Sequence, residues 1–113
     1  MARLVVLSSD HSRRGQISAE GVVGIARSFL GAGVRSILVT ICRIPDEATM
    51  IFMKEFYDKV AKGLSVCVAL QRSMIELKKK YPISAWAPFQ IVGEDIALSS
   101  DEIEEIRHIS CIR

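Results

Sequence analysis

Two short apolar runs, separated by one helical pattern, constrain the fold of this chain more than any other feature. The runs are Leu4–Leu7 and Ser36–Ile41, each bounded by polar residues or glycine. Apolar runs of about four to eight residues predict strands that are buried on both faces, as in parallel sheets. A helix is predicted between them, starting near Ser18 and ending at Gly31, because its apolar residues recur with helical spacing. Strand, helix and strand in this order predict a βαβ unit with two parallel strands.

The rest of the chain extends this α/β pattern. Two amphipathic helices are expected over Asp46–Lys62 and Ser65–Lys80, with the Ser65 hydroxyl as the N-terminal cap of the second. A third short strand is predicted at Phe89–Gly93. We therefore predict one α/β domain with a mostly parallel sheet over residues 1–95, followed by an acidic, weakly helical tail over residues 96–113.

The first predicted strand has an edge with no evident partner. Leu4–Leu7 begins almost at residue 1, so no upstream segment covers its free side. Unpaired apolar strand edges favour pairing with another chain. We expect either self-association of copies through this edge or a domain of which the present chain is the C-terminal portion.

Composition excludes several classes of protein. Of the 113 residues 50% are hydrophobic, and the mean hydropathy is +0.28, which excludes intrinsic disorder. The net charge is only +2, so no binding to nucleic acid or to an anionic membrane is expected. No apolar run approaches the ~18 residues of a membrane span. The chain has three cysteines and two histidines, all widely spaced: Cys42, Cys67, Cys111, His11 and His108. This spacing argues against a disulfide framework or a metal site and favours a reducing, cytoplasmic setting.

Polar residues follow the first two predicted strands, and they are the candidate site. Ligands of open α/β sheets bind beyond the carboxyl ends of the strands. Ser9, Asp10 and His11 follow the first strand, and Cys42 and Arg43 follow the second. A Ser/His/Asp triad is disfavoured, because neighbours on an extended chain point in opposite directions and Asp10 is poorly placed to orient His11.

Two further chemistries are possible at this end of the sheet. Arg13 and Arg14, with the helix start near Ser18, would suit an anion, although no phosphate-binding glycine motif follows the strand. Cys42 could be a reactive thiol next to Arg43, but a buried structural cysteine is the favoured interpretation. No cofactor is expected.

Several segments together resemble one known family. In order and spacing, the chain from Leu4 to Gly93 resembles the CHAT domain, a caspase- and separase-like domain often found downstream of tetratricopeptide repeats. The segments that carry the resemblance are Leu4–Ser8, Gly15–Gly24, Ala26–Gly33, Ser36–Thr40, Pro45–Thr49, Phe56–Tyr57, Gly63–Ser65, Ala69–Leu70, Trp86–Phe89 and Val92–Gly93. The resemblance implies a three-layer α/β/α, caspase-like sandwich, of which this chain is the C-terminal portion.

The resemblance also implies that the site is degenerate. Peptidase members carry a cysteine nucleophile in a Ser-Ala-Cys pattern after the first strand, where this chain has Ser8-Ser9-Asp10. An aspartate cannot form the thioester intermediate of a cysteine peptidase. The family's partner histidine lies upstream of that strand, and His11 does not match it. The family usually has a tryptophan where this chain has Cys42.

The resulting hypothesis is a catalytically inactive domain that acts as a protein-interaction or scaffold module and can self-associate. A remnant cleft would form its binding surface, made of Ser9, Asp10, His11, Arg13, Arg14, Cys42 and Arg43. Two alternatives stay open. The chain could be part of a cysteine peptidase whose dyad is completed elsewhere, with Cys42 as a displaced nucleophile, or it could be an anion- or nucleotide-binding α/β module.

Overall fold

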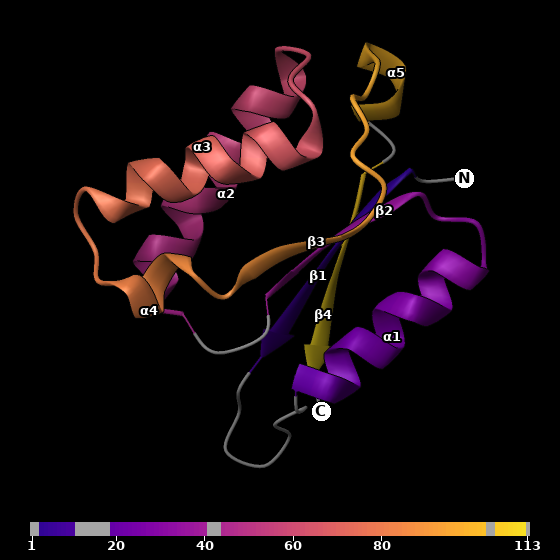
Figure 1. Cartoon of the computed structure of the whole chain (residues 1–113), viewed down its shortest axis with the longest axis horizontal. Helices are drawn as coiled ribbons and strands as arrows, with labels where there is room; N and C mark the ends of the chain where they lie inside the picture. Colours follow the sequence, from indigo (N-terminus) through magenta and orange to yellow (C-terminus); the bar gives the residue numbers. More distant parts are fainter. Residues whose placement is uncertain (1–2, 11–18, 41–43, 104–105, 113) are drawn as a thin grey trace.

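A computed structural model of the chain shows one sheet whose strands are connected by helices (Figure 1). The structure describes residues 3–10, 19–40, 44–103 and 106–112. None of the helices in these ranges is both long and apolar enough to cross a bilayer. The elements are β1 (Leu4–Asp10), α1 (Ala19–Gly31), β2 (Ser36–Thr40), α2 (Asp46–Ala61), α3 (Val66–Lys78), α4 (Ile83–Trp86), β3 (Phe89–Gly93), α5 (Ser100–Ile103) and β4 (Arg107–Ile112).

The four strands form one mixed sheet in the order β3-β2-β1-β4. β1 runs parallel to β2, with Leu4 opposite Ser36 and Ser8 opposite Thr40. β1 also runs parallel to β4, whereas β3 pairs antiparallel with β2. The predicted βαβ unit of β1, α1 and β2 is therefore confirmed, and the short strand predicted at Phe89–Gly93 is present.

The C-terminal segment differs from the prediction. A helical tail was expected over residues 96–113, but α5 is the only helix among the described residues of this range, and Arg107–Ile112 form β4. β4 pairs along β1 from Val5 to Asp10, so it covers the edge that we predicted to be free. This pairing occupies backbone N–H and C=O groups that would otherwise be unpaired. The expectation that Leu4–Leu7 offers an open edge for self-association is therefore wrong in this structure.

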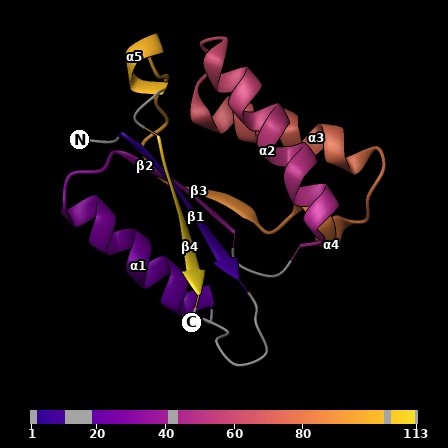
Figure 2. The same ribbon diagram turned by 180° about the vertical axis from the view of Figure 1, so that it is seen from behind.

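The sheet carries an apolar cluster on each face. Successive strand residues point to opposite faces, and Leu4 and Val6 belong to one buried cluster while Val5 and Leu7 belong to the other. The first cluster includes residues of α2, α3 and α4, and the second includes residues of α1. Figure 2 shows the same division, with α1 on one side of the strands and the α2–α3 pair on the other. Burial on both faces explains why β1 and β2 are continuous apolar runs.

Stacked aromatic rings join α2 to β3. The ring of Phe52 lies 3.6 Å from that of Phe89, centroid to centroid, with the planes only 8° apart. The Phe56 ring is also stacked with that of Phe52, with the centroids 5.8 Å apart. All three side chains are at most 2% exposed. Because Phe89 lies only three residues after the end of α4, this stack also holds α4 close to α2.

A glycine at the end of β3 allows the chain to pass close to the end of the α1–β2 connection. Gly93 has a φ of 114°, and a Cβ atom there would lie 2.5 Å from the carbonyl oxygen of Arg35. The same oxygen accepts a hydrogen bond of 3.0 Å from the Glu94 N–H. The Arg35 guanidinium in turn donates to the Glu94 carboxylate. Residue 93 therefore has to be glycine for β3 to end against β2 in this way.

Candidate functional site

The carboxyl ends of β1, β2 and β4 lie at the same edge of the sheet, because the three strands are parallel. Ser8 is opposite Thr40 on one side and Ser110 on the other. Asp10, the last residue of β1, is opposite Ile112. This is the edge where the resemblance places a peptidase nucleophile and where ligands of open α/β sheets bind.

Two of the predicted binding residues lie at this edge. Ser9 and Asp10 occupy the last two positions of β1. The other predicted site residues lie outside the described residues, so the structure tests neither the remnant cleft nor the proposed anion site; they are His11, Arg13, Arg14, Cys42 and Arg43.

One cysteine lies at this edge of the sheet although the sequence analysis had placed it in the C-terminal tail. Cys111 lies in β4 directly opposite Ser9 of β1. Three isoleucines at Ile106, Ile109 and Ile112 were the available signal, since β-branched residues are enriched in strands. The acidic run before them favoured a helical interpretation instead.

A second candidate site is an apolar groove on α3 and α4, about 290 Å³ in volume. Its α3 residues recur every three to four positions, so they lie along one side of the helix, next to the buried face. We call it the α3–α4 groove. It is lined by Cys67, Leu70, Gln71, Met74, Ile75, Lys78 and Trp86.

Side-chain and backbone partners fix the beginning of α3. The Ser65 hydroxyl accepts a hydrogen bond from the Val68 N–H at 3.3 Å, as expected for an N-terminal cap. The Asp95 carboxylate accepts from the Cys67 N–H at 3.0 Å. The Val66 N–H donates to the carbonyl of Ile96 at 2.8 Å. The first amides of α3 are thus bonded within the chain, and the segment after β3 holds this end of the groove in place.

The thiol at this end of the groove is unsuited to nucleophilic attack. Burial raises the pKa of the Cys67 thiol, and the hydrogen bond and charge of Asp95 raise it further. The pKa of the Asp95 carboxyl is lowered, first by the Cys67 N–H and then by the Ser65 hydroxyl. Only the thiolate form of a cysteine is an effective nucleophile. The raised pKa therefore argues against Cys67 as a nucleophile.

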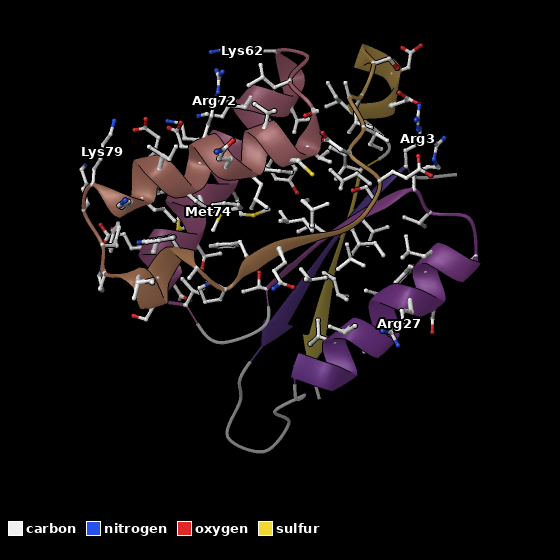
Figure 3. The ribbon with its side chains drawn as sticks, viewed as in Figure 1. Arg3, Arg27, Lys62, Arg72, Met74 and Lys79 are labelled. Carbon is white, nitrogen blue, oxygen red and sulfur yellow. The ribbon has the colours of Figure 1, made fainter. Side chains whose placement is uncertain are left out.

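Basic residues are concentrated in the C-terminal half of α3 and directly after it. Residues 72–80 contain four basic residues, Arg72 and Lys78 to Lys80, against one acidic residue, Glu76. Lys79 forms an ion pair of 3.2 Å with Glu76. Within the part of the chain that the structure describes, no ion pair joins Arg72, Lys78 or Lys80 to a carboxylate. Figure 3 shows Arg72 and Lys79 extending outward from the α2–α3 pair.

Sequence reasoning missed this groove because an apolar groove wall and a core face have the same residue types. The one available signal was Ile75, which lies off the buried stripe of α3 and is 49% exposed. Trp86 packs against the core and also forms part of the groove wall.

Comparison with known proteins places these features in a family. The model of the CHAT domain matches residues 1–94. Tetratricopeptide repeat protein 28 of Mus musculus is 35% identical over 101 residues, and its Homo sapiens counterpart is 34% identical over 101 residues. Each match covers 87% of this chain but only 4% of the relative, so the chain corresponds to a small part of those proteins. No solved structure matches the chain.

Proposed function

The chain belongs to the CHAT domain family, and we propose that it is a catalytically inactive member that binds protein partners. The observation that carries this proposal is Asp10 at the last position of β1. The family resemblance places the cysteine nucleophile of the peptidase members there. A carboxylate cannot replace a thiolate in forming a thioester.

Other features support a binding role. Cys67, a free cysteine, has a raised pKa and is held as a thiol, so it does not substitute for the nucleophile. The relatives are named as tetratricopeptide repeat proteins, and repeat arrays of this kind create extended binding surfaces. We therefore infer that the chain acts as an interaction or scaffold module within such an assembly.

We also infer the caspase-like, three-layer arrangement that the resemblance implies. The two apolar clusters support it, because α1 packs on one face of the sheet and α2 and α3 on the other. A cytoplasmic setting stays a prediction from the spacing of the cysteines. Self-association also stays a prediction, and light scattering across a range of concentrations would measure it. Any contact between copies would have to use a surface other than the β1 edge, which β4 occupies.

Peptide cleavage tests the central proposal. The full chain is incubated with a pool of fluorogenic peptides, and we expect no cleavage above the buffer rate. Cleavage that Asp10→Ala abolishes would show that the chain is an enzyme. Asp101→Ala is the matched control, since it removes an exposed carboxylate of α5 far along the chain from Asp10.

Two further measurements address the alternatives of a displaced peptidase nucleophile and an anion-binding module. An electrophilic peptide that labels Cys42 faster than Cys67 and Cys111 would indicate a displaced peptidase nucleophile. A rise in Tm with ATP or sulfate, lost when Arg13 and Arg14 are both replaced, would indicate an anion-binding module, because a ligand that binds only the folded state stabilises it.

A further inference from the structure

We propose that the α3–α4 groove binds an acidic, amphipathic helical segment of a partner protein. The proposal rests on the protein-binding function above and names the chemistry of the partner. It concerns a surface on α3 and α4, and none of the lining residues belongs to β1.

The size and lining of the groove favour a peptide side chain as its occupant. Its volume of about 290 Å³ is at the lower limit of small-molecule pockets, which run from ~300 to 1,000 Å³. Leu70 and Met74 are partly buried, and Ile75 is 49% exposed. Methionine adapts to differently shaped apolar partners, and tryptophan, here Trp86, is enriched among the residues that dominate binding energy. An amphipathic helix places apolar side chains at i, i+3, i+4 and i+7 into such a groove.

The charges at the groove select an acidic partner. Lys78 is part of the lining, and Arg72 and Lys79 lie three residues before and four residues after Ile75 of the lining, so both border the groove on the exposed side of α3. Glu76 is the single carboxylate among them. Carboxylates beside the apolar face of a bound helix would meet these cations, which gives specificity and a faster association rate. Nucleic acid is the less suitable occupant, because the chain carries a net charge of only +2 and the groove is mainly apolar.

The chain contains its own reporter for this interaction. Trp86 is the sole tryptophan and lines the groove. The probe is a synthetic helical peptide of about 16 residues, free of aromatic residues, with leucines along one face and glutamates beside them. A matched peptide carries lysine at every glutamate position. Titration of the full chain with the acidic peptide is expected to shift the Trp86 emission to shorter wavelength, and the lysine peptide is expected to leave it unchanged.

Two pairs of variants locate the binding. Lys78→Glu is expected to weaken the acidic peptide about fivefold or more, as a rim ion pair is lost and a repulsion is added. Arg27→Glu makes the same charge change on the exposed surface of α1 and should have no effect. Ile75→Glu is expected to weaken binding at least tenfold by placing a charge in the apolar groove. Met50→Glu, at a 72% exposed position of α2 outside the groove lining, is its control.

Three outcomes would overturn the proposal. One is the absence of binding of the acidic peptide at millimolar concentration. Another is equal binding of both peptides. The third is a Trp86 response to DNA or to anionic lipid vesicles that exceeds the response to the acidic peptide. These failures are distinguishable from failure of the proposed function, because a chain that cleaves no peptide could still bind partners through another surface. Circular dichroism of each variant verifies that it is folded.

Discussion

Replacing Phe52 by alanine should remove a large part of the stability of the chain. Phe52 is fully buried on α2 and stacks with both Phe56 and Phe89. Burying a phenylalanine side chain contributes about 1.5–3 kcal/mol, and each aromatic pair adds roughly 0.5–1.5 kcal/mol. With the cavity that alanine leaves, we expect a loss of about 4 kcal/mol in the free energy of unfolding, within the range of ~3–5 kcal/mol for such changes. Domains are commonly stable by only about 5–15 kcal/mol.

Urea unfolding followed by circular dichroism measures this loss. Met50→Ala on the same helix is the control, because that side chain is 72% exposed and its removal should cost no more than about 0.5 kcal/mol. Phe52→Leu should be intermediate. The native Trp86 emission should also change in Phe52→Ala, since Phe89 connects the stack to α4. A loss below about 1.5 kcal/mol with an unchanged urea dependence would refute the argument that this stack holds α2, β3 and α4 together.

Three further predictions concern the segments that position the groove and the sheet. Gly93→Ala should destabilise the chain by about 2 kcal/mol, because Gly93 has a positive φ and the new methyl group would clash with the Arg35 carbonyl oxygen. Gly24→Ala is the control in the same unfolding assay. It adds a methyl group at an open position inside α1 and should stabilise the chain by roughly 0.5–1 kcal/mol. Ser65→Ala should cost about 1 kcal/mol by removing the cap of α3, and Ser65→Thr, which keeps the hydroxyl, should retain most of the stability. The lowered pKa of Asp95 means that its contribution to stability is fully present above the ordinary carboxyl pKa and is lost as the pH falls through the lowered value. The stability difference between wild type and Asp95→Asn should therefore shrink below about pH 4, and a difference that grows on acidification would contradict the assigned hydrogen bonds.

Local patterns were sufficient for most of the elements. The continuous apolar runs of β1 and β2 predicted strands buried on both faces, and residues from both runs belong to two separate clusters. Ser65 was predicted as the cap of α3, and its hydroxyl does accept a bond from the first turn. These predictions succeeded because each depends on interactions between residues near one another in sequence.

The features that the sequence analysis missed, β4 and the α3–α4 groove, depend on contacts between residues that are distant in sequence. β4 is a strand because it pairs with β1, about a hundred residues earlier in the chain, and no local pattern encodes that partner. The α3–α4 groove lies where α4 packs against α3 and leaves Ile75 and Trp86 partly uncovered, although both residue types would fit a core. At the carboxyl end of β1 the sequence placed Asp10 in a loop after the strand, whereas the strand extends to Asp10, and the structure adds Cys111 on the neighbouring strand.

The position of β4 has a consequence for the synthesis of the chain. β1 can pair with β2 as soon as residue 40 has emerged, but its other edge stays open until residues 107–112 follow. At translation rates of about 5–20 residues per second, this interval lasts several seconds or more. An unpaired apolar strand is an aggregation hazard during that time. Shortening the interval, by a circular permutation that joins the end of β4 to the start of β1 through a crossover linker of at least about a dozen residues, as parallel strands require, should therefore raise the yield of soluble chain without changing the final sheet.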